Sequence, residues 1–154
     1  GMYCLDNNRY AQILVAAPLF PTESGLAYTF SGAFLYDLSM QSSIMKYGIS
    51  GTGPTNITSA TGVWLYGGLV FVTDGLVSRG PFDYRVITYP KVLVFDYSTG
   101  KLIRTFGSRG TGSGQFICPT GICVYNDIVY VNDISLAKTL RFTTEGLFLG
   151  DLSY

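Results

Sequence analysis

Short apolar runs separated by turn residues dominate the pattern of hydrophobic and polar positions along this chain. The clearest runs have four or five residues and lie in pairs joined by two turn residues, at 63–66, 69–73, 122–125 and 128–132. Runs of that length predict β-strands, and a Gly-Gly or Asn-Asp link predicts a hairpin. No window shows a sustained helical period, so the pattern predicts an all-β fold.

The same pattern returns after 59 residues. Residues 33–74 align with residues 92–133 without a gap, and 13 of the 42 aligned positions are identical. Each unit predicts four short strands in a meander, which we name a, b, c and d in chain order. Such self-similarity is typical of a β-propeller, in which sheets pack face to face around an axis. A β-sandwich explains the strands but not a glycine-rich linker of constant length.

The repeat predicts a single domain over residues 2–154. Its blades are a partial first blade at 2–53, a second at 60–112 and a third at 119–151. Residues 2–6 resemble a strand b, so the first blade is expected to lack strand a. An alternative places strands a and b within 25–37.

Eleven strands in just under three blades cannot close a ring, because closed propellers usually need four to eight blades. The two terminal sheets would then expose large apolar faces. The sequence therefore predicts a propeller segment that a second chain completes to about six blades, as a homodimer. The alternative is that this chain is a fragment of a longer propeller.

Composition narrows the chemistry. Ten Lys and Arg balance ten Asp and Glu, which argues against a nucleic-acid binder, and the absence of histidine excludes imidazole catalysis. The three cysteines Cys4, Cys118 and Cys123 are too few for a disulfide framework, and we expect buried free thiols, with a Cys118–Cys123 bridge as the alternative. The longest apolar stretch is broken by Pro18, so no membrane span is expected. Gly1 resembles a cloning remnant.

Residues 107–116, followed by Pro119, Thr120, Gly121 and Ile122, resemble the linker of the NHL-repeat propellers. The runs at 129–133 and 92–96 resemble strands b and c of that family. The resemblance implies blades of four antiparallel strands. Some propellers of this kind are enzymes, including a zinc-dependent lyase and metal-dependent lactonases. The lyase would need histidine ligands, which this chain lacks, and the acidic residues show no spacing diagnostic of a lactonase.

Long connections on a rigid scaffold usually carry function, and two of them, 7–32 and 75–91, are predicted to join strands b and c at one edge. Arginine and aromatic side chains are favoured in binding sites. The candidate binding residues on these connections and on the nearby linker are Arg9, Tyr10, Arg79, Phe82, Tyr84, Arg85 and Arg109. The alternative is that the connections cover sheet edges or form the contact between chains.

Asp6, Asp74 and Asp133 each end a run that resembles strand b. In a ring they would approach the axis, where several carboxylates can hold Ca²⁺ or another divalent ion. Alternatively, each carboxylate accepts hydrogen bonds from the backbone of its own loop. Residues that recur with a repeat more often serve the repeat, so no cofactor is expected.

The sequence thus favours a non-enzymatic binding or scaffold module that recognises a protein, peptide or glycan through its long loops. The alternatives are a lactonase-like, metal-dependent hydrolase that uses the strand-b aspartates, and a purely structural half-ring. The triplet that starts at Asn56 is a glycosylation sequon, which favours a secreted setting.

Overall fold

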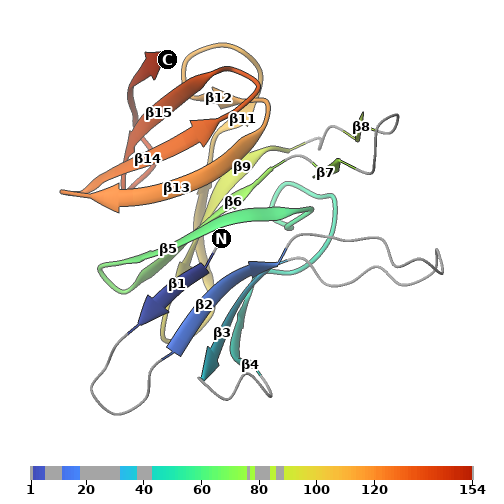
Figure 1. Cartoon of the computed structure of the whole chain (residues 1–154), viewed down its shortest axis with the longest axis vertical. Coiled ribbons are helices and arrows are strands. Elements are labelled where there is room, and N and C mark those ends of the chain that lie inside the picture. The colour runs from blue at the N-terminus through green and yellow to red at the C-terminus, as the bar shows by residue number, and fades with distance from the viewer. Residues whose placement is uncertain are drawn as a thin grey trace.

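The computed structural model describes residues 2–5, 12–17, 32–37, 43–75, 77–78, 84–85 and 89–153, and side chains over 32–35, 45–75 and 89–153. Within these residues every regular element is a β-strand, which confirms the all-β prediction. Most of the strands belong to three four-stranded antiparallel sheets that follow one another along the chain (Figure 1).

The three sheets account for twelve strands. Sheet 1 consists of β1 (Met2–Leu5), β2 (Gln12–Ala17), β3 (Gly32–Asp37) and β4 (Ser43–Tyr47). Sheet 2 consists of β5 (Ala60–Tyr66), β6 (Leu69–Asp74), β9 (Lys91–Asp96) and β10 (Leu102–Phe106). Sheet 3 consists of β13 (Pro119–Tyr125), β14 (Ile128–Asp133), β15 (Lys138–Thr143) and β16 (Phe148–Ser153).

Two short pairs lie outside the sheets. Strands β7 (Val77–Ser78) and β8 (Tyr84–Arg85) pair antiparallel in the connection that joins β6 to β9. Strands β11 (Ser108–Arg109) and β12 (Gln115–Phe116) pair parallel in the linker that joins sheet 2 to sheet 3.

The predicted hairpins between strands a and b are present in sheets 2 and 3. Gly67 and Gly68 link β5 to β6 with φ of +56° and +74°, and Asn126 and Asp127 link β13 to β14 with φ of +49° and +59°. Positive φ at both central residues gives a turn whose twist matches that of the flanking strands. Glycine adopts it freely, and Asn and Asp tolerate it better than other residues.

Sheet 1 corrects the prediction for the N-terminus. Residues Met2–Leu5 form its first strand rather than a strand b, because in the described part of the chain β1 pairs with β2 alone, and β2 lies between β1 and β3. Sheet 1 therefore has all four strands, and the alternative that placed strands a and b within 25–37 is also wrong. The predicted insertion at 7–32 contains β2 and divides into two shorter connections.

The sheets pack face to face through two buried clusters. The first joins sheets 1 and 2 and includes Ala33, Leu35, Tyr47, Val63, Val70, Val72, Leu93 and Phe95. The second joins sheets 2 and 3 and includes Phe71, Val92, Val94, Phe106, Val129, Val131, Leu140 and Phe142. Sheet 2 is thus covered on both faces, and β6 and β9 are buried at almost every position.

Among the described residues, sheet 3 is covered on one face only. Along β14, the buried residues Val129, Val131 and Asp133 alternate with the half-buried Ile128, Tyr130 and Asn132. Successive side chains of a strand point to opposite faces, so this alternation means that a single face packs on sheet 2. Strand β15 shows the same alternation from Thr139 to Thr143.

Tyr47 gives the interface between sheets 1 and 2 a dependence on pH. Its buried hydroxyl donates a 2.7 Å hydrogen bond to the carbonyl oxygen of Tyr97. Burial, together with nearby Tyr97 and Asp96, raises the pKa of Tyr47 well above its usual value. The folded state therefore favours the neutral hydroxyl of Tyr47. The stability that this hydroxyl contributes is present below the usual tyrosine pKa of about 10 and is lost as the pH rises above that value.

We expect the free energy of unfolding of the wild-type chain to fall more steeply between about pH 9 and pH 11 than that of a Tyr47→Phe variant. At neutral pH the variant should be less stable by about 1 kcal/mol, because the Tyr97 carbonyl loses its donor. Urea unfolding at several pH values measures both effects. Equal slopes for the two proteins at alkaline pH would contradict the assignment, and Tyr125→Phe, at an exposed site, is the control.

Candidate functional site

One edge of the three sheets carries the long connections, and we call it the loop edge. It comprises the linkers 48–59 and 107–118 and the connections 75–90 and 134–137; in Figure 1, β7 and β8 of this edge lie on the right, and β11 and β12 lie at the top. Residues 76, 79–83 and 86–88 lie outside the described residues. Neighbouring parts of the edge touch: the Thr61 hydroxyl of sheet 2 donates a 2.8 Å hydrogen bond to the carbonyl oxygen of Pro119 in sheet 3.

The two linkers have the same backbone structure although their sequences differ in the middle. Gly51 N–H bonds the Ile57 carbonyl at 3.1 Å, and Gly110 N–H bonds the Phe116 carbonyl at 3.0 Å. Ile57 and Phe116 are both fully buried, so either an aliphatic or an aromatic side chain can anchor the linker. The predicted repeat of 59 residues therefore extends through the linkers.

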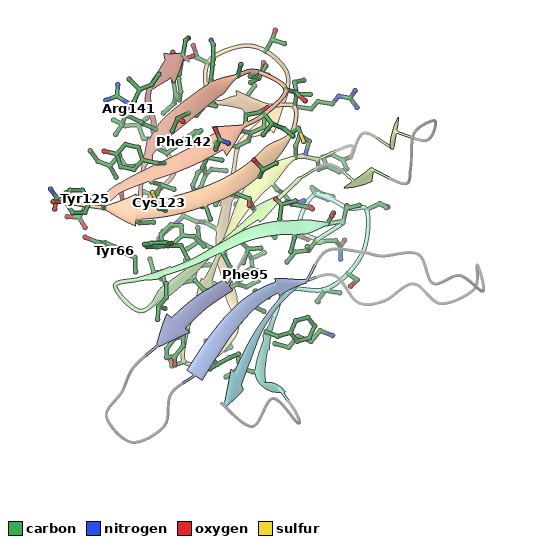
Figure 2. All side chains as sticks on the ribbon, viewed as in Figure 1. Tyr66, Phe95, Cys123, Tyr125, Arg141 and Phe142 are labelled. Atoms are coloured by element: carbon green, nitrogen blue, oxygen red, sulfur yellow. The ribbon has the colours of Figure 1, made fainter. Side chains whose placement is uncertain are left out.

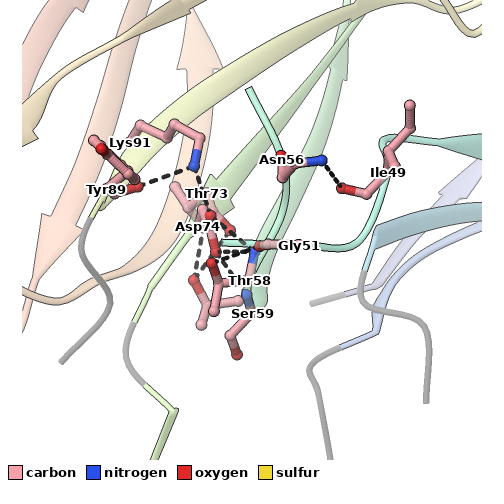
Figure 3. A network of polar contacts seen from close by, with 10 residues as sticks. Ile49, Gly51, Asn56, Thr58, Ser59, Thr73, Asp74, Tyr89 and Lys91 are labelled. Carbon is pink, nitrogen blue, oxygen red and sulfur yellow. Dashed lines mark hydrogen bonds and ion pairs between the residues drawn. The ribbon is translucent and has the colours of Figure 1, made fainter. Parts of the chain in front are cut away.

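Asp74 fastens the first of these linkers (Figure 3). One carboxylate oxygen accepts a 2.6 Å hydrogen bond from Ser59 N–H, and both oxygens lie 3.0–3.1 Å from Thr58 N–H. The second oxygen also receives the ammonium of Lys91 at 2.8 Å. Both Asp74 and Lys91 are buried, and Lys91 donates a further 3.0 Å bond to the Tyr89 carbonyl.

Asp133 fastens the second linker in the same way. Its Oδ2 accepts hydrogen bonds from Ile117 N–H at 2.8 Å and Cys118 N–H at 2.9 Å. Its Oδ1 accepts bonds from Ser135 N–H at 3.0 Å and Leu136 N–H at 3.1 Å. The carboxylate thus joins a linker to the connection that follows its own strand.

These contacts show what Asp74 and Asp133 do in the fold. Each oxygen of both carboxylates already accepts a bond from the protein, which is how a buried carboxylate is stabilised without a metal. Within the described residues, no group of three or more His, Cys, Asp or Glu could hold a metal ion. The two aspartates therefore accept hydrogen bonds from the backbone of loops in their own sheets, which the sequence analysis gave as the alternative to a metal site.

Asp6 lies outside the described residues, so its predicted place beside Asp74 and Asp133 stays a prediction. It follows β1, a first strand, whereas the other two end second strands. In sheet 1, register places Ala17 opposite Gly32, where sheet 2 pairs Asp74 with Lys91. Sheet 1 therefore has alanine at the position of the recurring aspartate.

The candidate binding residues do not all belong to one edge. Arg109 is exposed in β11 at the loop edge, and Tyr84 and Arg85 form β8 in the connection at the same edge. Arg79 and Phe82, in that connection, lie outside the described residues. Arg9 and Tyr10 also lie outside them.

The sequence reasoning missed three exposed apolar residues at the loop edge. Ile49 is 71% exposed, Ile134 is 58% exposed and Tyr89 is 44% exposed. Each belongs to a different connection: the first linker, the segment after β14 and the segment before β9. Their position directly beside a strand end was the available signal, but an isolated apolar residue in a loop is common and is not informative by itself.

Residues 79–109 contain six basic residues against two acidic ones, but the structure does not gather those that it describes on one surface. Lys91 is buried against Asp74, and Arg104 donates a 2.9 Å hydrogen bond to the Thr144 carbonyl in sheet 3. Lys101 precedes β10 at the edge opposite the loop edge. Arg109 is thus the member of this group that the described structure leaves exposed at the loop edge.

Cys118 and Cys123 are free thiols, as expected. Cys118 is buried, and Cys123 is half-buried, so burial raises the pKa of the Cys123 thiol. The described residues contain no helix that could cross a membrane.

No protein-family model matches the chain, and no curated protein matches its sequence.

Proposed function

We propose that this chain is a segment of an NHL-like β-propeller and acts as a non-enzymatic binding or scaffold module. Three sheets of equal strand number and order follow one another and pack face to face, which is how propeller blades are arranged. The first strands β5 and β13 lie side by side, as the inner strands of neighbouring blades do. The NHL-like residues at 107–116 form the linker, and 129–133 and 92–96 form second and third strands.

The observation that carries the binding function is the group of exposed apolar residues at the loop edge, Ile49, Tyr89 and Ile134, together with the exposed Arg109. Binding surfaces are enriched in aromatic residues and arginine, and the loop edge exposes an aromatic and two aliphatic residues as well as an arginine. The residues come from three connections, and Asp74 and Asp133 bond the backbone of the first linker and of the segment after β14. An edge of this composition fits a protein or peptide ligand best, and a glycan can stack on Tyr89.

Selection from a random peptide library tests this function, with immobilised chain as the bait and a glycan array as a parallel screen. We expect the wild-type chain to enrich a defined set of ligands. The double variant Ile49→Ser/Ile134→Ser should bind them roughly tenfold more weakly or worse, because it removes two apolar contacts from the edge.

The matched control is Leu147→Ser, since Leu147 is 67% exposed but lies in the turn between β15 and β16, at the opposite edge. It should bind like the wild type. Ligands that bind all three proteins equally, or the absence of any enriched ligand, would contradict a binding role for the loop edge.

A further inference from the structure

The charged residues of the chain are not divided evenly between its two edges. The formal net charge of the chain is zero, but the four segments of the loop edge contain three arginines and one aspartate: Arg79, Arg85, Arg109 and Asp83. The described residues of these segments include no acidic residue, and Arg109 is exposed. Asp74 and Asp133 end strands beside this edge, but both are buried and hydrogen-bonded. The described surface of the loop edge is therefore positive.

The opposite edge has the reverse charge. Its described turns in sheets 2 and 3 carry two exposed carboxylates, Asp127 and Glu145, and one cation, Lys101. The hydroxyl of Tyr66 donates a 3.0 Å hydrogen bond to Asp127 at this edge, and Figure 2 shows Tyr66 and Tyr125 there, on the left. Complementary charge steers a ligand and selects its orientation. A ligand that binds the loop edge through its charge should therefore be acidic.

Two exposed residues of the loop edge depart from the 59-residue repeat. Arg109 stands where the first linker has Ser50, and Ile134 stands where the connection after β6 has Gly75. Arg109 is exposed, and the Ile134 side chain is 58% exposed. The strand-end aspartates recur in both units and serve the fold. A departure that places a large side chain in solvent serves something else, and binding is the role that such residues fulfil best.

The packing of sheet 3 explains why the earlier unit has glycine at this position. A Cβ atom at Gly75 would collide with the carbonyl oxygen of Pro119, and it would lie 2.8 Å from the side chain of Thr61. No larger residue fits between sheets 2 and 3 at this point. Among the described residues, none covers Ile134 in this way, and its side chain extends into solvent. The isoleucine is therefore not needed for the contact between sheets.

Arg109 and Ile134 border one short segment of the second linker. Strands β11 and β12 pair so that Arg109 lies opposite Phe116, which is fully buried. Ile134 N–H donates a 3.2 Å hydrogen bond to the carbonyl oxygen of Cys118. Asp133 bonds backbone N–H groups of both the linker and the segment after β14. The backbone beneath the two residues is thus fixed, and an extended peptide, which advances about 3.3 Å per residue, can contact both within a few residues.

The guanidinium of Arg109 has its donors available for a ligand. It makes no hydrogen bond or ion pair with a described residue. Lys138, which follows the connection 134–137, is paired with Asp151 at 2.6 Å and adds no net charge. A guanidinium binds a carboxylate through two parallel hydrogen bonds. Phosphate recognition usually employs a cluster of arginines, so one exposed arginine in the described edge matches a carboxylate better.

We propose that the ligand of the loop edge is a peptide segment with an internal Asp or Glu, whose carboxylate binds the Arg109 guanidinium and whose neighbouring apolar side chain packs on Ile134. This proposal rests on the function proposed above, because it names the class of ligand for the same edge. The charge pair orients the peptide, and the apolar contact removes the Ile134 side chain from water. A peptide with only one of the two groups meets only half of the site.

Two synthetic peptide arrays test the class of ligand. Both contain the same short random sequences, acetylated and amidated so that no terminal charge contributes. The central residue is Asp or Glu in the acidic array, and Asn or Gln in the amide array. For matched peptides, the wild-type chain should bind the acidic member roughly tenfold more tightly. This preference should shrink as the salt concentration rises, because the pair is exposed.

Three variants assign the preference to particular residues. Arg109→Gln should bind the two arrays about equally, because it removes the guanidinium. Lys101→Gln removes the same charge at the opposite edge and should keep the preference. Ile134→Gly restores the residue of the earlier unit; it should bind acidic peptides several-fold more weakly but still prefer them to their amide counterparts. Circular dichroism should show that all three variants fold like the wild type.

Equal binding of the wild-type chain to the two arrays would overturn the proposal, and so would a preference that Arg109→Gln retains or Lys101→Gln loses. A third array with phosphoserine at the centre would overturn the choice of a carboxylate if its members bound more tightly. Random-library ligands without an acidic residue would refute this class of ligand and leave the proposed function standing. The absence of any enriched ligand would refute both.

Discussion

Replacing Asp74 with alanine should lower the free energy of unfolding by about 3–5 kcal/mol, the cost of removing one member of a buried ion pair. The variant leaves the Lys91 ammonium buried without its carboxylate and leaves Thr58 and Ser59 N–H without an acceptor. Folded domains are stable by only about 5–15 kcal/mol, so a large part of the stability is lost. Urea unfolding followed by circular dichroism measures the change.

Lys91→Met separates the contribution of the ion pair from that of the backbone hydrogen bonds to Asp74. Asp74 keeps the backbone donors of Thr58 and Ser59 in this variant, so its cost should be smaller than that of Asp74→Ala. In the background of Asp74→Ala, Lys91→Met should recover part of the lost stability, because no charge is then left buried alone. The control is Lys101→Ala at an exposed turn. Additive costs in the double variant would contradict the coupling of Asp74 to Lys91.

Phe142→Ala should cost about 3–5 kcal/mol, the usual range for removing a buried phenylalanine. Phe142 is almost fully buried, and its ring centroid lies 5.0–5.6 Å from those of Phe106, Phe116 and Phe148. These rings come from sheet 2, the linker and sheet 3. Their contacts hold sheet 3 on sheet 2. The cavity that Phe142→Ala leaves should therefore weaken the contact between the two sheets.

The weaker contact between sheets 2 and 3 can be measured because Trp64, the chain's single tryptophan, packs against the same cluster. Its fluorescence should shift to the red at a lower urea concentration in Phe142→Ala than in the wild type. Leu147→Ala, at an exposed position, should leave the midpoint unchanged. An unchanged Trp64 transition in Phe142→Ala would show that the aromatic cluster does not hold the sheets together.

Most of sheets 2 and 3 could be predicted from the sequence, because a local signal fixes each strand and the repeat fixes their order. The pairs Gly67-Gly68 and Asn126-Asp127 specify turns through their backbone freedom alone. The alignment at 59 residues then places β9 and β10 without reference to anything distant. Local preference and overall fold agree there, which is the condition for a correct prediction.

Sheet 1 was mispredicted because its strands carry no signal that tells a first strand from a second. Residues 2–6 are an apolar run that ends in aspartate, as second strands do in the other sheets. The distinction depends on pairing: β2 hydrogen-bonds to both β1 and β3, and no residue of β1 reports that.

The candidate site was less predictable than the fold. The sequence singled out the aspartates but could not show that backbone N–H groups and Lys91 bond all of their oxygens. Apart from Ser135 and Leu136 N–H, those donors lie 15–17 residues away along the chain. It could not identify Ile49 or Ile134 as exposed, since burial depends on how neighbouring linkers pack. The ring, the second chain and the ligand stay predictions.

The fastening by Asp74 and Asp133 is internal to each 59-residue unit. The carboxylate at the end of a second strand binds the linker that enters the first strand of its own sheet, not that of a neighbour. If such a unit were duplicated in tandem within a gene, the linker before its first strand would therefore be hydrogen-bonded within the new unit itself. The new unit would need only a neighbouring sheet face on which it can pack. Arrays of this design can gain or lose whole units, whereas the loss of half a unit would leave a linker untethered.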